Sequence, residues 1–141
     1  MKIQILSDVY DAGGMDPAQV GDAGLDLRST EHHMIHRYGS IRVPLGVKIE
    51  LLPTTFGLLT NRSSLFEKNI LMNQGVIDSG YRGELTALLF NLNSGPVEII
   101  KGARIAQLLV VHVDPPTQWI VVDNLSESGR GEGGFGSTGE K

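Results

Sequence analysis

The sequence contains no cysteine, which excludes disulfide-stapled scaffolds and thiolate metal sites. No apolar run approaches the roughly 20 residues of a membrane helix, so no membrane partner is expected. The 12 Lys and Arg are outnumbered by 16 Asp and Glu, and this net charge of −4 argues against a nucleic-acid partner. The amino terminus becomes polar after Leu6, too early for a secretory signal, so we expect a soluble cytoplasmic protein.

The length of 141 residues and the hydrophobic content of 40% suit one folded domain. Apolar and polar residues alternate over 41–49, the pattern of a half-buried strand, and more briefly around Ile3 and Ile5. Further strands are predicted over 56–60, 83–93, 96–100, 104–113 and 119–122. The segment 63–69 predicts one short helix capped by Ser63 or Ser64. Short strands at such spacing indicate an all-β sandwich or barrel.

The last sixteen residues, 126–141, differ from the rest of the chain. Six of them are glycine, and the segment has no aliphatic side chain. Such a composition cannot bury enough surface to offset ordering entropy of about 1–2 kcal/mol per residue. We therefore expect a core over 1–125 followed by a mobile arm, in which Arg130 and Phe135 stand out as a lone cation and a lone aromatic ring.

Five segments interrupt the strand pattern with polar residues that suit a binding site better than a core. They are DAGLDLR at 22–28, NRSSL at 61–65, NQGVIDSGYRGE at 73–84, RIAQL at 104–108 and RGEGGFGSTG at 130–139. Taken alone, each also fits a structural role, such as an outward strand residue, a helix cap or a hairpin tip. Their order and wording together closely resemble the five motifs of the trimeric dUTPases, over most of the chain.

This resemblance implies a fold and an activity. The fold is an all-β distorted jelly-roll barrel of the dUTPase type (a β-clip), with one short helix and a flexible carboxyl-terminal arm. The activity is hydrolysis of dUTP to dUMP and pyrophosphate, which lowers dUTP and supplies dUMP for thymidylate synthesis. The resemblance also implies a homotrimer in which the arm 126–141 passes to another subunit and closes its active site.

The resemblance gives each motif residue a role. Asp78 matches the catalytic aspartate, which orients and deprotonates the water that attacks the α-phosphorus. Tyr81 matches the aromatic residue that stacks under deoxyribose and excludes a 2′-hydroxyl. The uracil wall is formed by Gly75, Val76 and Ile77, with a side-chain contact from Asn73.

The remaining matched residues would handle the triphosphate and its counterion. Contacts with phosphate are implied for Arg62, Ser63, Ser64 and Gln107, and Arg104 is expected to support Asp78. In the arm, Arg130 would contact the γ-phosphate, Phe135 would stack on uracil, and Gly136, Ser137 and Thr138 would form a small-residue cradle. A Mg²⁺ ion is implied, held by phosphate oxygens and waters and reached by Asp26 through water only.

Two other functions share this fold. A dCTP deaminase has similar Arg-Ser-Ser and Ile-Asp-x-Gly features, but it needs a proton-transferring glutamate ten positions after the aspartate. That position is Leu88 in this chain, which cannot move a proton. A nucleotide-sensing or regulatory protein would use the same fold to bind partners, and the intact Asp78 and carboxyl-terminal arm favour an enzyme.

Overall fold

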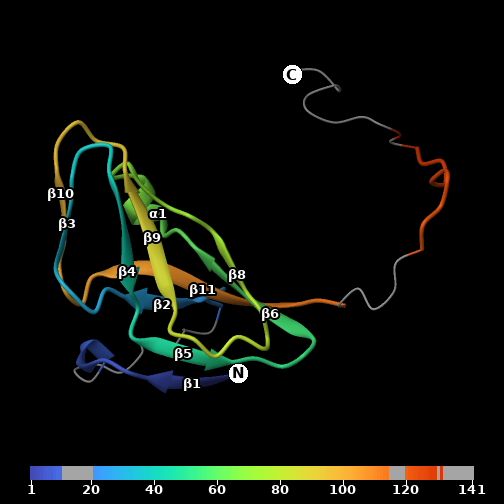
Figure 1. Cartoon of the computed structure of the whole chain (residues 1–141), viewed down its shortest axis with the longest axis horizontal. Helices are drawn as coiled ribbons and strands as arrows, with labels where there is room; N and C mark the ends of the chain where they lie inside the picture. Colours follow the sequence, from blue (N-terminus) through green and yellow to red (C-terminus); the bar gives the residue numbers. More distant parts are fainter. Residues whose placement is uncertain (11–20, 115–119, 130, 132–141) are drawn as a thin grey trace.

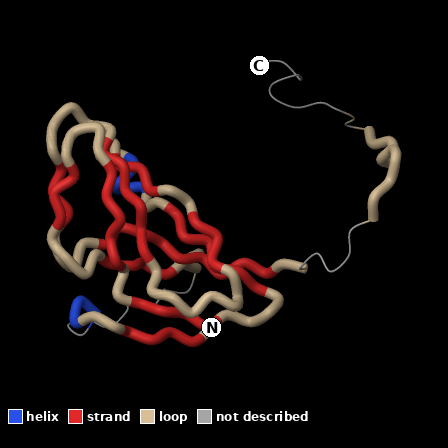
Figure 2. The backbone as a smooth tube through the Cα atoms, in the orientation of Figure 1, coloured by secondary structure: helices blue, strands red, loops and turns tan. Residues whose placement is uncertain are grey.

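The computed structural model describes residues 1–10, 21–114, 120–129 and 131, and almost all regular structure within them is β (Figures 1 and 2). The elements are β1 (Lys2–Ile5), η1 (Asp8–Tyr10, a 3-10 turn), β2 (Leu25–Arg28), β3 (His33–Ile35), β4 (Ser40–Pro44), β5 (Val47–Glu50), β6 (Thr55–Thr60), α1 (Ser63–Phe66), β7 (Ile70–Met72), β8 (Gly75–Ile77), β9 (Thr86–Asn91), β10 (Val97–Ile99) and β11 (Arg104–His112). The prediction of an all-β fold with one short helix is confirmed. No helix in these ranges is long and apolar enough to cross a bilayer.

The strands form four antiparallel sheets that wrap around one core. The largest has the order β2-β11-β6-β8, and a second has the order β4-β9-β7. Two-stranded sheets, β1-β5 and β10-β3, complete the barrel. Nearly every pairing joins segments far apart in the sequence, as in β11 with β2 and β10 with β3 (Figure 1).

The core contains the inward residues of these strands. In β6 buried and partly buried residues alternate along the whole strand, as a period of two requires. The aliphatic side chains that are 0% exposed include Leu27, Val43, Leu45, Val47 and Ile105. Each contributes about 1.5–3 kcal/mol by leaving water. They place β2, β4, β5 and β11 around a common interior, and the polar motifs are carried on its outer side.

Two strand predictions need correction. The alternating segment 41–49 is two strands, because Gly46 adopts φ +65° between β4 and β5. A Cβ at this position would also lie 2.6 Å from Cγ2 of Thr30, so only glycine fits there. The hydrophobic alternation therefore continues through a turn that separates two strands. The strand predicted over 119–122 is wrong for residues 120–122, which have no strand structure, and Trp119 lies outside the described residues.

The helix prediction was correct in place and wrong in detail. Helix α1 ends at Phe66 rather than at 69, since Asn69 takes a left-handed φ of 54° just before β7 begins. Its N-cap is Arg62, which makes no side-chain capping bond, instead of Ser63 or Ser64. Both serines are thus exposed in the first turn rather than used for the cap.

Candidate active site

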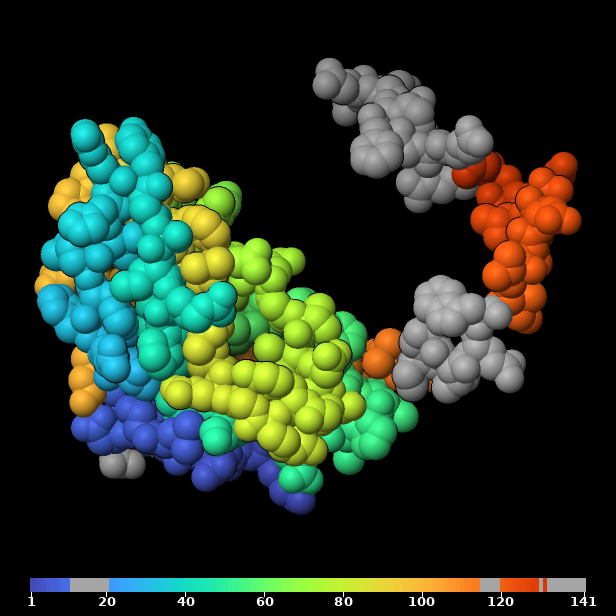
Figure 3. Space-filling view, in the orientation of Figure 1, coloured from blue at the N-terminus to red at the C-terminus, as the bar shows by residue number. Residues whose placement is uncertain are grey.

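A pocket of about 230 Å³ opens between β8, the loop after it, and the outer face of the β4-β9-β7 sheet. Figure 3 shows this side of the molecule, where turquoise residues near 40 lie beside yellow-green residues near 80. The lining residues are Arg42, Leu59, Asn73, Gly75, Val76, Ile77, Asp78, Tyr81, Glu84, Leu85, Thr86 and Leu88. The residues that the sequence predicted for uracil, deoxyribose and catalysis, from Asn73 to Tyr81, are therefore brought together in one concavity.

Strand β8 supplies one wall of the pocket, and one of its backbone edges pairs with no strand of the described residues. It pairs with β6 through Leu59↔Gly75 and Gly57↔Ile77, and it is the last strand of its sheet. Gly57 permits this close pairing, because a Cβ there would lie 3.2 Å from Cβ of Ile77 and 3.0 Å from Cδ1 of Leu108. An edge strand presents backbone N–H and C=O groups that no neighbouring strand uses. The wall can therefore read a ligand by main-chain hydrogen bonds.

The loop after β8 is held by its own residues. The Tyr81 N–H donates to the Asp78 carbonyl at 3.0 Å, and Arg82 Nη1 donates to the carbonyls of Ser79 at 2.7 Å and Tyr81 at 2.8 Å. The Tyr81 hydroxyl donates to the Glu84 carbonyl at 3.2 Å. These bonds fix a turn from which Asp78 and Tyr81 both face the pocket.

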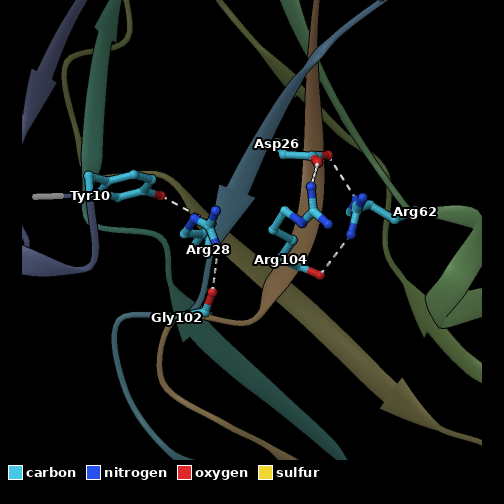
Figure 4. A network of polar contacts seen from close by, with 6 residues as sticks. All are labelled: Tyr10, Asp26, Arg28, Arg62, Gly102 and Arg104. Carbon is cyan, nitrogen blue, oxygen red and sulfur yellow. Dashed lines mark hydrogen bonds and ion pairs between the residues drawn. The ribbon is translucent and has the colours of Figure 1, made fainter. Parts of the chain in front are cut away.

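A second polar cluster lies on the β2-β11-β6 part of the large sheet (Figure 4). The Asp26 carboxylate pairs with Arg62 Nε at 2.8 Å and with Arg104 Nη1 at 3.4 Å. Arg62 also donates to the Arg104 carbonyl at 3.4 Å. Gln107 lies opposite Asp26 in the strand register. Gly24 leaves room for the Gln107 side chain, because a Cβ at Gly24 would lie 2.8 Å from Cγ of Gln107. Two guanidiniums on one carboxylate leave a positive charge, which suits an anion.

Strand β2 is anchored from its other end by Tyr10. This side chain is 1% exposed; its hydroxyl donates to the Leu45 carbonyl at 2.6 Å and accepts from the Arg28 N–H at 3.1 Å. Arg28 Nη1 donates in turn to the Gly102 carbonyl at 2.9 Å (Figure 4). Burial raises the pKa of Tyr10 above its ordinary value, with Glu84 adding to the effect and Arg28 opposing it. The neutral phenol thus fixes the strand that carries Asp26.

The structure therefore sorts the predicted site residues into two groups within one chain. Of the predicted phosphate ligands that the structure describes, Arg62, Ser63, Ser64 and Gln107, none lines the pocket of Asp78. Arg104 forms its ion pair with Asp26, so support of Asp78 by Arg104 stays a prediction. The arm residues Arg130, Phe135, Gly136, Ser137 and Thr138 lie outside the described residues.

Sequence reasoning missed the contribution of β4 to the pocket, and from β9 it considered only Leu88. Arg42 lies opposite Leu88 in the β4–β9 register, and its Nη1 donates to Thr86 Oγ1 at 3.0 Å. Alternation along β4 identified Arg42 as an outward residue, but only the strand pairing places it beside Asp78. Leu88 itself lines the pocket at the position where a deaminase requires glutamate.

Comparisons with known proteins agree with this geometry. The dUTPase family model matches residues 12–139. The deoxyuridine 5′-triphosphate nucleotidohydrolase of Paramecium bursaria Chlorella virus 1 is 42% identical over 120 residues, 84% of each chain. The enzyme of the same name from Clostridium kluyveri is 42% identical over 125 residues, 86% of this chain and 87% of its own. The Staphylococcus bacteriophage 80alpha dUTPase, solved with dUpNHpp, superposes with a TM-score of 0.87 at 28% identity, covering 99% of this chain and 98% of its own. The chain belongs to the dUTPase family.

Proposed function

We propose that this protein hydrolyses dUTP to dUMP and pyrophosphate, with Asp78 as the base that activates the attacking water. The observation that carries the proposal is that Asp78 shares one pocket with the free edge of β8 and with Tyr81. The reaction needs three parts around the nucleoside. They are a wall that binds the base, which β8 supplies, a ring that packs on the sugar, which is Tyr81, and a carboxylate, which is Asp78.

Uracil suits the edge of β8 because its own edge alternates acceptor, donor and acceptor. A strand edge presents the complementary alternation of N–H and C=O groups over Gly75, Val76 and Ile77. Cytosine carries an amino donor where uracil has the O4 acceptor, and a bare N3 acceptor where uracil has an N–H donor. The same wall would therefore leave two positions mismatched, at a cost of about 1–3 kcal/mol each. The side chain of Asn73 lies in the same pocket and would add a further contact.

The reaction is an in-line displacement at the α-phosphorus. Asp78, held by the loop bonds described above, takes a proton from water as the water oxygen attacks, and pyrophosphate leaves from the opposite side. Tyr81 lies under the deoxyribose and leaves no room for a 2′-hydroxyl. The triphosphate would be bound by Arg62, Ser63, Ser64 and Gln107. The positive charge that polyphosphate requires would come from Arg62 and Arg104, which share the single carboxylate of Asp26.

The separation of the two groups supports a composite site in a homotrimer. A pocket for the nucleoside on one subunit would then meet a phosphate cluster from another. Exposed apolar residues also favour assembly: Ile120 is 84% exposed, Val121 96% and Leu125 88%, on a segment that Figure 3 draws apart from the core. The arm beyond it would pass to another subunit, where Phe135 stacks on uracil and Arg130 meets the γ-phosphate.

The residues present fit a Mg²⁺ ion that is held through water. Asp26 is 19% exposed in its side chain and already faces two guanidiniums, which disfavours direct coordination of a metal ion. Its carboxylate still has lone pairs that can accept hydrogen bonds from metal-bound water. The described residues offer no cluster of three His, Asp or Glu side chains for a metal. When bound, the ion would supply positive charge that neutralises the negative charge developing on the phosphates in the reaction.

Turnover of dUTP by the purified protein with Mg²⁺ tests the proposal, with pyrophosphate and dUMP as the measured products. Asp78→Asn should retain dUTP binding and lose turnover by about 100-fold or more. dCTP should yield no ammonia, because Leu88 replaces the proton-transferring residue. Full turnover by Asp78→Asn would refute the assigned base, and a wild-type protein that binds dUTP without hydrolysing it would indicate the regulatory alternative.

A further inference from the structure

Gly83 lies next to the hydroxyl end of the Tyr81 ring. A Cβ added at Gly83 would be 2.2 Å from Oη and 2.4 Å from Cζ of Tyr81, distances at which a real Cβ cannot stand. The backbone does not explain the glycine, because Gly83 is absent from the described glycines with positive φ. The residue is therefore needed for the space that it leaves and not for its conformation.

We propose that Gly83 is a positioning residue that sets the preference for deoxyribose over ribose by letting the Tyr81 ring lie where it does. The inference rests on the proposed function, in which Tyr81 is the ring under the sugar. The Tyr81 hydroxyl reaches the Glu84 carbonyl at 3.2 Å only by crossing over residue 83. Any larger residue at 83 blocks that path, so the ring position depends on the hydrogen atom that glycine has in place of a side chain.

The structure also indicates how a methyl group at 83 would be accommodated. Tyr81 is 45% exposed, so its ring can turn toward solvent by a change of rotamer. The backbone of the loop is held independently of that ring, by the bonds from Arg82 to the carbonyls of Ser79 and Tyr81. The ring is thus expected to move while Asp78 stays in place. A variant with a methyl group at residue 83 should therefore lose selectivity between deoxyribose and ribose while it retains hydrolysis.

The test measures kcat/KM for dUTP and for UTP in the wild type and in Gly83→Ala. We expect the dUTP-to-UTP ratio to fall by about tenfold, mainly through KM for dUTP and improved use of UTP. Gly95→Ala is the matched control, since a Cβ at Gly95 meets nothing within 4 Å, and its ratio should equal that of the wild type. An unchanged ratio in Gly83→Ala would overturn the inference.

A second background separates the ring from every other effect of the substitution. In Tyr81→Ala the clash partner is gone, so adding Gly83→Ala should change neither kcat/KM nor the ratio further. If Gly83→Ala alone fails to fold, Tyr81→Ala/Gly83→Ala should fold, and failure of both would show that the glycine serves the backbone and would refute the proposal. A wild type that leaves dUTP intact would refute the proposed function itself. A wild type that hydrolyses dUTP and UTP equally would refute only the sugar-selecting roles of Tyr81 and Gly83.

Discussion

Replacement of Asp26 by asparagine tests whether the cluster on the large sheet is organised by one carboxylate. Asn keeps the shape and one acceptor oxygen but removes the charge that faces Arg62 at 2.8 Å and Arg104 at 3.4 Å. We expect the variant to be less stable and slower with dUTP, because both guanidiniums then repel each other and lose the group that orients them.

The magnitude follows from the exposure of the cluster. The side chains of Asp26 and Arg62 are 19% and 23% exposed, and that of Arg104 is 47% exposed. Exposed pairs contribute about 0.2–1 kcal/mol, whereas breaking a buried pair costs about 3–5 kcal/mol. An intermediate loss of about 1–2 kcal/mol is expected, equivalent to a fall in Tm of about 3–8 °C. Misplacement of Arg62 should lower kcat/KM for dUTP by about tenfold.

Asp8→Asn is the matched control for this substitution. Asp8 forms an ion pair of similar length, 2.9 Å, with Lys101, and the side chains are 69% and 52% exposed. The hydrogen bond and charge of Lys101 lower the pKa of Asp8, but solvent screens the pair, so the variant should unfold in urea like the wild type. The reasoning is refuted if Asp26→Asn leaves both the urea midpoint and kcat/KM unchanged, or if Asp8→Asn is destabilised to the same degree.

Other features of the structure give three further predictions. Tyr10→Phe leaves the Leu45 carbonyl and the Arg28 N–H without their buried partner, so urea unfolding should show a loss of about 1–3 kcal/mol. Burial raises the pKa of Tyr10 above 10.0, so the stability that its neutral phenol contributes is complete below about pH 10 and is lost as pH rises through the raised value. The free energy of unfolding of Tyr10→Phe should therefore depend less steeply on alkaline pH than that of the wild type. Arg82→Met removes the bonds that hold the catalytic turn, and steady-state kinetics should show kcat/KM lowered by about fivefold with the Tm nearly unchanged. Deletion of 126–141 should leave a cooperatively unfolding core with turnover reduced by about 100-fold or more, and near-normal turnover would contradict the role proposed for the arm.

The strand content was readable from the sequence because each face of a strand has its own composition. The alternation in 41–49 reports which side chains leave water, and β4 and β5 follow it. The break at Gly46 was not readable, since the residues on both sides continue the same alternation. The short strands β2, β3, β7 and β8 were also missed, because three or four residues are too few to show a period.

The candidate site shows the same division between local and distant information. The motif over 73–84 is contiguous, so its residues had to lie close together, and the pocket around Asp78 contains them. Arg42 enters that pocket only because β4 pairs with β9 in the register Arg42↔Leu88, and a one-residue shift would turn its side chain to the opposite face. The role of Gly83 depends on a side-chain position rather than on a pattern, since many glycines in this chain mark turns.

Composition and motif order identify which residues carry the chemistry, whereas the strand register decides which of them one subunit brings together. Arg62 pairs with Asp26 and does not line the pocket of Asp78, and this is the structural reason for expecting the site to be completed by a second copy of the chain.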